Sequence, residues 1–264
     1  YGEELGKTPM TERTMPPVKN QELLYVETDG SMLLTREEGW REVKLGRIFK
    51  SGDCIRTDGK ADSIRHSQYL AHLGGAREFN NQMDELIESY GSLGKQLAFI
   101  SDGAVWIKNW IEDSFPNAVS ILDYYHASEH LHTFAQGFFT DEKTRKKWSH
   151  LQLSLLWESK VDKVINNISQ VAPNDKEAKN LIDYYQNNKA RMDYKHYRQI
   201  GCGIIGSGAI ESAHRSVIQK RMKLSGQRWS KRGAQNMLNL RVTYMNGQWS
   251  KVIELTKTDF KAAA

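Results

Sequence analysis

Hydrophobic residues recur at every second position in three stretches near the start of the chain. This alternation, seen for example at Leu24 and Val26, predicts strands over residues 23–34, 41–51 and 63–74. Polar turns separate the three stretches, which suits an antiparallel meander.

The spacing of apolar residues then changes to a helical one, which predicts a helix over residues 76–90. Two compact apolar runs, 97–101 and 118–122, predict buried strands, and they are separated by a helix over 105–115. A further helix is expected over 126–139. Meander strands followed by alternating strands and helices predict an α/β fold with a mixed five-stranded sheet and flanking helices.

The pattern divides the chain into four parts. Residues 1–22 contain three prolines and are expected to form a linker or irregular arm. We assign residues 23–140 to the first part of the core and 141–200, which are helical throughout, to an all-α insertion. Residues 201–264 are expected to complete the core with further helices.

Composition excludes several classes of protein. The 264 residues are 39% hydrophobic, which is enough for a core, and they contain no apolar run long enough to span a membrane. Cys54 and Cys202 lie far apart, which argues against a disulfide scaffold or a cysteine-based zinc site and suits a reducing compartment.

Positive charge is concentrated after Glu211. Residues 212–264 hold eleven basic and two acidic side chains, although the net charge of the chain is only +5. A basic block on a mildly acidic body indicates a surface for polyanions such as DNA. The alternative is a solvated helix face, although such faces usually mix charges of both signs.

Three acidic residues occupy informative positions. Asp29 lies on the first predicted strand, Asp102 at the end of a buried strand, and Glu211 near the start of a helix. Carboxylates are ligands that Mg²⁺ prefers, and paired ions can support in-line displacement at a phosphodiester. Singly, Asp29-Gly30 and Asp102-Gly103 could be turns and Glu211 a helix-start acid, so the hypothesis of a metal site depends on the three together.

Six short motifs spread over nearly the whole chain form an ordered series. They are Glu27–Gly30, Arg41–Gly46, Ile100–Gly103, Leu122–Leu131, Ile205–Glu211 and Gly226–Ser230. With them the chain resembles the bacterial insertion-sequence transposases of the DDE class, of the Kra type.

The resemblance implies an RNase-H-like catalytic core, interrupted by an α-helical insertion before the last catalytic helix. It also implies that the catalytic, metal-binding acids are Asp29, Asp102 and Glu211, holding two Mg²⁺ or Mn²⁺ ions. The implied activity is hydrolysis and strand transfer at transposon ends. The implied partners are transposon-end and target DNA, with a homo-oligomer on DNA, in the bacterial cytoplasm beside the nucleoid. An N-terminal DNA-binding region is missing, so we expect a fragment of a longer protein.

Asp123 and His126 match a D-x-x-H signature that occurs in several transposase groups. His126 could orient a ligand or contact DNA, and the equal alternative is a helix-capping aspartate with a satisfied histidine. His126 and His130 stand four residues apart, a spacing that could bind zinc. The sequence reveals no third ligand, so zinc is the less favoured interpretation.

The basic block also supplies candidate DNA contacts. These are Arg215, Lys220, Arg221, Arg228, Trp229 and Arg232. The cations would bind phosphates without sequence preference. Trp229 could stack on a base, but a tryptophan packed against the sheet is at least as good an interpretation.

Three alternatives stand beside the main prediction. A nuclease on the same fold would use the same acids, and a domesticated, non-cutting DNA-binding protein would keep the basic surface without the chemistry. The third is a dinucleotide site, because residues 201–206 match G-x-G-x-x-G. We reject it since no predicted strand precedes the motif and no acidic residue follows Glu211 closely enough.

Overall fold

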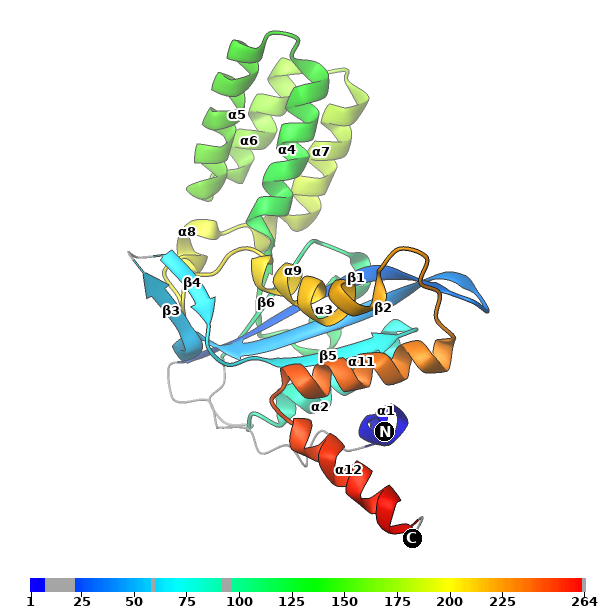
Figure 1. Cartoon of the computed structure of the whole chain (residues 1–264). Coiled ribbons are helices and arrows are strands. Elements are labelled where there is room, and N and C mark those ends of the chain that lie inside the picture. The colour runs from blue at the N-terminus through cyan, green and yellow to red at the C-terminus, as the bar shows by residue number, and fades with distance from the viewer. Residues whose placement is uncertain (8–21, 58–59, 92–95, 263–264) are drawn as a thin grey trace. The chain divides into compact units, whose positions relative to one another are not determined.

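The computed structural model describes residues 1–7, 22–57, 60–91 and 96–262. It shows a mixed α/β fold whose five-stranded sheet has the order β5-β2-β1-β6-β7, with many flanking helices (Figure 1). This arrangement is consistent with an RNase-H-like fold and confirms the predicted fold class. The chain forms two compact units: the first contains residues 1–96 and 208–264, and the second residues 97–207.

The strands of the first unit form an antiparallel meander, as predicted. β1 (Leu23–Thr35) pairs with β2 (Gly39–Lys50), and β2 pairs with β5 (Gln68–Leu73). The third predicted strand is divided, because its first residues belong to β4 (Lys60–Ile64), which pairs with β3 (Cys54–Thr57). Alternation alone does not locate such a break, since both halves are extended.

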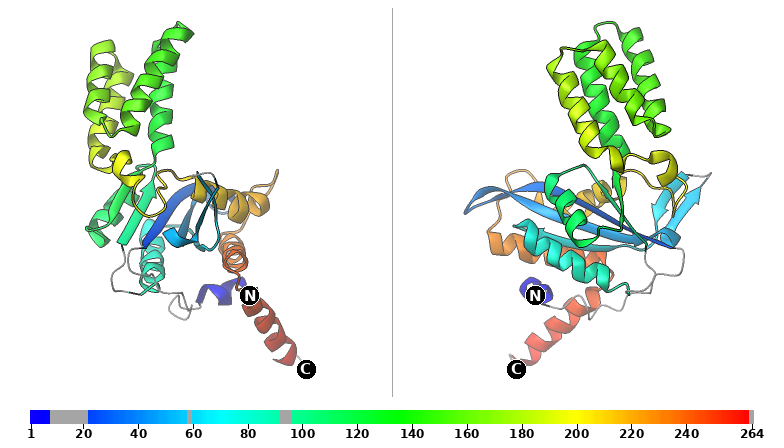
Figure 2. Two further views of the ribbon diagram at one scale, coloured as in Figure 1. Left: turned by 90° about the vertical axis from the view of Figure 1, so that its left-hand side faces the viewer. Right: turned by 180° about the vertical axis from the view of Figure 1, so that it is seen from behind.

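The two faces of this meander carry different helices. Successive residues of a strand point to opposite faces, so Gly46 and Leu45 of β2 face different partners. On one face lies α2 (Ala76–Glu88), and a Cβ added at Gly46 would come within 2.3 Å of the Met83 sulfur. Figure 2 shows α2 and α11 (Lys231–Met245) on different sides of these strands. The glycine therefore permits the close packing of α2.

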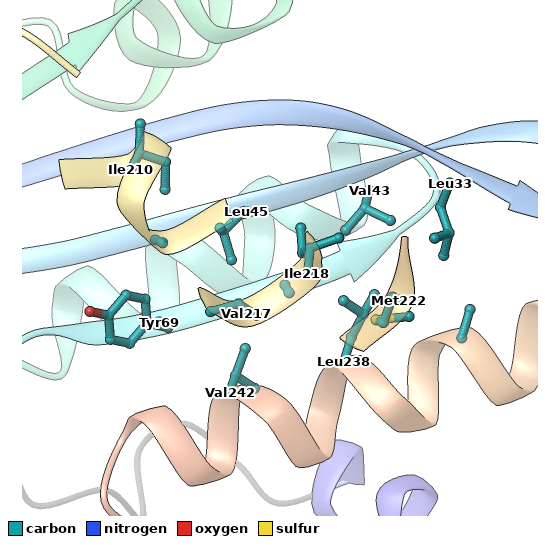
Figure 3. Packing of buried hydrophobic residues seen from close by; sticks show 13 residues of the cluster. Leu33, Val43, Leu45, Tyr69, Ile210, Val217, Ile218, Met222, Leu238 and Val242 are labelled. Atoms are coloured by element: carbon teal, nitrogen blue, oxygen red, sulfur yellow. The ribbon is translucent and has the colours of Figure 1, made fainter. Parts of the chain in front are cut away.

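The opposite face is covered by a continuous helical segment and by α11. The segment consists of α9 (Gly208–Ala213), a π-helical turn (His214–Gln219) and α10 (Lys220–Met222). Figure 3 shows its buried side chains between the strands and α11. The cluster includes Leu33, Val43, Leu45, Ile210, Val217, Ile218, Met222, Leu238 and Val242. Burial of these side chains fixes the segment on the sheet.

One helix of the first unit was not anticipated. Gly2–Lys7 form α1, where we expected an irregular arm, whereas α12 (Trp249–Ala262) lies in the part for which further helices were expected. Helix α1 packs on α11, with Leu5 buried and the Asn239 amide donating to the Gly2 carbonyl at 2.8 Å. A contact with a distant helix stabilises this short element, which a local pattern does not reveal. The rest of the predicted arm, residues 8–21, lies outside the described residues.

Two buried charged residues of the sheet hold the start of α9. Glu27 is fully buried and accepts a hydrogen bond of 2.7 Å from the Ile210 amide. Arg47, which is directly opposite it on β2, donates to the Ala209 carbonyl at 2.7 Å and to the Ser67 hydroxyl at 3.0 Å. A buried charge is tolerated only when it is hydrogen-bonded. We name this arrangement the Glu27–Arg47 clamp.

The second unit contains a parallel strand pair and a helical bundle. β6 (Gln96–Ser101), which begins one residue before the unit, pairs in parallel with β7 (Val119–Leu122), and α3 (Val105–Ser114) connects them. The bundle consists of four helices, α4 (Tyr124–Phe138), α5 (Glu142–Trp157), α6 (Val161–Val171) and α7 (Lys176–Asn188) (Figure 1). After them come a 3-10 turn, Lys189–Arg191, and α8 (Tyr194–Tyr197). The helices predicted between residues 141 and 198 are therefore present.

Aspartates begin four helices of the second unit. The side chains of Asp123, Asp141, Asp175 and Asp193 each accept a hydrogen bond from a backbone amide in the first turn of the helix that follows. Such caps satisfy amides that lack an intrahelical partner. They explain why the helices begin where they do. Among the described residues, no helix is sufficiently long and apolar to cross a bilayer.

A buried arginine ties together the strand ends of the second unit. Arg191 is 6% exposed, and its guanidinium donates to the Ser101 hydroxyl at 2.7 Å, to the Asn188 side chain at 3.2 Å and to the Ile121 carbonyl at 3.4 Å. Removal from water lowers the pKa of Arg191, although an arginine stays protonated in proteins. The arginine therefore fixes the end of β6, directly before Asp102.

The Glu27–Arg47 clamp yields a stability prediction. Glu27→Gln keeps the shape of the side chain but removes the charge that strengthens the bond to the Ile210 amide. We expect the free energy of unfolding, measured by urea denaturation, to fall by about 1.5–3 kcal/mol. The matched control is Glu85→Gln on the exposed face of α2, which should change it by less than about 0.5 kcal/mol. Equal losses of unfolding free energy in the two variants would show that the Glu27–Arg47 clamp does not contribute to stability.

The buried arginine yields a second prediction. Arg191→Met fills a similar volume but leaves the Ser101 hydroxyl and the Ile121 carbonyl without this donor. Thermal unfolding should report a loss of about 1–3 kcal/mol, and Arg191→Lys, which keeps a cation, should lose less. Lys189→Met is the control, because Lys189 is half exposed and pairs with Asp162 on the surface. A loss from Lys189→Met as large as that from Arg191→Met would contradict the assignment.

Candidate functional site

Asp29 lies on β1 on the same face as the buried Glu27. One oxygen of its carboxylate accepts a 2.7 Å bond from the Gly30 amide, and the other lies 3.2 Å from Nε2 of His214. The Asp29 side chain is 36% exposed, whereas Glu27 is completely buried. Asp29 is therefore the carboxylate of this strand that a solvent ion can reach.

The helix that carries Glu211 runs along β1. Ile210 contacts Glu27, and His214 contacts Asp29. A strand advances about 3.3 Å per residue and a helix about 1.5 Å, so two strand residues and four helix residues both span roughly 6 Å. The two contacts thus define one short stretch where strand and helix lie side by side.

Glu211 lies within this stretch and is exposed. Residues three apart share a side of a helix, so Glu211 lies next to His214, and His214 contacts Asp29. Two of the three predicted acids, Asp29 and Glu211, thus lie on the strand and the helical segment that run side by side in the first unit.

His214 begins the π-helical turn and is 5% exposed at its side chain. A π turn breaks the regular pattern of backbone hydrogen bonds and is often found at functional sites. Here Arg241 of α11 donates to the carbonyls of Ser216 and Val217, which supplies partners for backbone acceptors of the turn. The irregular turn that holds His214 against Asp29 is thus supported from α11.

A lysine also lies near Asp29. The charge of Asp29 raises the pKa of Lys223, but removal of the amine from water has the larger effect and lowers it. Asp29 is thus in the electrostatic range of both His214 and Lys223. Sequence analysis did not identify either residue as part of the site.

Asp102 belongs to the second unit, where it follows the last residue of β6. Its carboxylate accepts a 3.0 Å bond from the Ala104 amide, and its carbonyl accepts one of 3.3 Å from the Tyr184 hydroxyl. Burial raises the pKa of Tyr184, so the hydroxyl keeps its proton and can donate. Gly103 has a φ of +93°, and a Cβ there would lie 3.1 Å from Leu122. The turn that presents Asp102 is therefore fixed by its neighbours.

Asp123 has structural partners that account for its carboxylate. It is 2% exposed, caps α4 through the Tyr125 amide at 2.8 Å and accepts a short hydrogen bond from Ser207. This is the capping arrangement that sequence analysis left open for Asp123.

The G-x-G-x-x-G motif of residues 201–206 follows helix α8 and not a strand. A dinucleotide site needs a strand before the motif, so this agrees with the rejection of such a site.

His126 and His130 face one another on α4. Their Nε2 atoms are 3.2 Å apart, and the rings are nearly perpendicular. The ring of Tyr184 lies 4.4 Å from that of His130, between centroids. Thus Tyr184 contacts both the histidine pair and the Asp102 turn, which the sequence spacing did not suggest.

The predicted DNA-contacting cations are exposed side chains of the first unit. Arg215, Lys220 and Arg221 lie on the helical segment that carries Glu211, and Arg228 and Arg232 lie beyond it. Arg228 and Arg36 line an open hollow of about 510 Å³. The surface that follows Glu211 is therefore both basic and accessible.

Trp229 is packed rather than exposed. Its indole donates to the Met222 carbonyl at 3.1 Å, and its ring packs against the core cluster of the first unit. Its backbone pairs with β1 at Thr35. Of the two interpretations that the sequence left open for Trp229, this geometry favours packing against the sheet.

The acids of the first unit suit a hard cation. Asp29 and Glu211 are partly or fully exposed carboxylates, and oxygen donors are the ligands that Mg²⁺ and Mn²⁺ prefer. Among the described residues, no three His, Cys, Asp or Glu side chains form a ready-made metal cluster.

Several residues of the site were missed by sequence analysis although a signal was present. Glu27 and Arg47 are charged residues at core-facing positions of amphipathic strands, and His214 follows Glu211 by three residues. A charge at a core-facing position is a sign of a buried polar contact. No local signal marks Tyr184 or Arg191, because their partners are distant in sequence.

Comparison with known proteins identifies relatives of the chain. The profile of an uncharacterised protein family, UPF0236, matches residues 6–259. A protein of Streptococcus gallolyticus, described as the UPF0236 protein in the vanSb 3′ region, is 23% identical over 253 residues. The match covers 93% of the chain and 54% of the relative, so the chain spans about half of the relative's length. The chain belongs to the UPF0236 family of uncharacterised proteins.

Proposed function

We propose that the chain is the catalytic part of a DNA transposase of the DDE class. The activity would be metal-dependent hydrolysis of a phosphodiester at a transposon end, followed by strand transfer to target DNA. The observation that carries this proposal is that the helical segment of Glu211 lies along β1, with His214 against Asp29, and continues into an exposed basic surface. Carboxylates hold the ions that such a reaction needs, and cations bind the polyanionic substrate.

Each acid has a distinct role in the proposal. Asp29 and Glu211 would be the metal ligands of the first unit, and Asp102 would be the metal ligand of the second. Bound Mg²⁺ or Mn²⁺ would activate the attacking oxygen and stabilise the leaving oxygen. The protein's contribution is to hold the carboxylates: the Glu27–Arg47 clamp fixes the helix of Glu211, and Tyr184 and Arg191 fix the strand end of Asp102.

His214 would act as a positioning residue within this site. Its imidazole is almost completely buried and lies against one oxygen of Asp29. This close contact would help to hold a ligating carboxylate in one orientation.

The basic surface would follow the DNA backbone. Arg215, Lys220 and Arg221 continue the helical segment that carries Glu211, so a phosphate near Glu211 has cations within a few helical turns. A helix rotates by about 100° per residue, so not all of the cations can face the same duplex. A homo-oligomer on DNA and a bacterial cytoplasmic location complete the proposal.

Removal of either acid should abolish cutting. We expect Asp29→Asn and Glu211→Gln to lower Mn²⁺-dependent nicking of a supercoiled plasmid on the order of 100-fold or more, since each removes a metal ligand while retaining the shape. Mn²⁺ binding, followed by electron paramagnetic resonance, should weaken in parallel. Glu85→Gln serves as the control on an exposed carboxylate of the same unit. Normal nicking by either acid variant would exclude that residue from the site.

Charge removal should change the salt dependence of DNA binding. Arg228→Ala and Arg221→Ala should each flatten the plot of log affinity against log salt by about one unit if the residue contacts a phosphate. The loss should be similar for DNA of any sequence, because phosphates carry no sequence information. The matched control is Arg77→Ala, an exposed arginine on α2. Slopes that equal the slope of the control would show that these residues form only a solvated face.

A further inference from the structure

The histidine pair of α4 has a geometry that the proposed DNA chemistry does not use. The Nε2 atoms of His126 and His130 converge to 3.2 Å, and their rings are inclined by 87°. Both residues are in the second unit, on the helix that begins the bundle.

We propose that His126 and His130 form a binding site for a first-row transition-metal cation of the Zn²⁺ and Ni²⁺ class. Imidazole nitrogens suit these ions, whereas carboxylates suit Mg²⁺ and Mn²⁺. The site is therefore chemically distinct from the carboxylate site of the proposed function, and it does not depend on that function.

The separation of the two nitrogens matches shared coordination. Zinc binds histidine nitrogens at about 2.0–2.1 Å in tetrahedral geometry, which places two such ligands about 3.3–3.4 Å apart. The observed 3.2 Å is close to this value. Residues four apart on a helix lie on one face, so the backbone of α4 presents both rings without strain.

A carboxylate lies on the far side of the His126 ring. Oε2 of Glu129 is 3.8 Å from Nδ1 of His126, opposite the Nε2 atom that faces His130. A carboxylate near this nitrogen is a common neighbour of a metal-binding histidine.

The pair is also held in place. The ring of Tyr184 lies against His130, and the Tyr184 hydroxyl donates to the Asp102 carbonyl. A pre-arranged pair loses less conformational entropy on binding an ion. Two protein ligands leave coordination positions open, so water or a phosphate oxygen can complete the coordination.

The competing explanation is a direct hydrogen bond from one imidazole to the other, which the same 3.2 Å permits. It predicts an interaction within the protein and no affinity for metal. Titration of the untagged full chain with Ni²⁺, followed by isothermal calorimetry, separates the two.

We expect one Ni²⁺ ion per chain at this site, and at least about ten-fold weaker binding in His126→Ala and in His130→Ala. His126→Asn, which keeps a polar side chain, should show the same loss as His126→Ala. The matched control is His132→Ala, because His132 is exposed on the same helix but two residues beyond His130. Circular dichroism checks that every variant is folded.

Affinity within two-fold of the unaltered chain in both alanine variants would overturn the proposal and leave only the hydrogen bond. An equal loss in His132→Ala would overturn it as well, since binding would then be non-specific. Asp29→Asn should retain Ni²⁺ binding at the histidine pair. The His126 and His130 variants thus test the histidine site, and the Asp29 variant tests the carboxylate chemistry.

Discussion

The burial of Glu27 and Arg47 beneath the first turn of α9 is the constraint on which the site of the first unit depends. Both are charged, both are nearly inaccessible to water, and each binds a backbone group at the start of the helix. A buried charge without its partner is strongly destabilising. The helix therefore has one favourable position on the sheet, and Glu211 is positioned with it.

The alternation of residues along β1 determines where Asp29 lies relative to α9. Residues two apart share a face, so the position that buries Glu27 also places Asp29 on the helix side, where it remains 36% exposed. A shift of one residue in the pairing of β1 would turn both carboxylates to the α2 face. The apolar cluster around Leu45 and Val217 opposes that shift, because it needs the same register.

Sequence patterns predicted the helices and strands whose formation depends on residues close together in the chain. The alternation in β1 and β2 and the helical spacing of α2 correspond closely to the observed elements, because each buries one face. The β3–β4 hairpin, α1 and the Arg191 contacts were not predicted, since they depend on partners far along the chain. For the site, spacing pointed to Asp29 and Glu211, but the contact of His214 with Asp29 required the path of the helix. The metal, the DNA and the roles of Asp29, Asp102 and Glu211 stay predictions.

Each unit places a buried arginine next to a candidate acid. Arg47 binds the carbonyl two residues before Glu211, and Arg191 binds the side chain directly before Asp102. A hydrophobic side chain of similar volume would leave these acceptors without their donor, which costs stability. What the arginine adds is direction, because its rigid fork fixes several acceptors at once. In the proposed function these acids hold metal ions, which requires fixed positions. The two arginines fix the backbone next to each acid and also contribute to the stability of the fold.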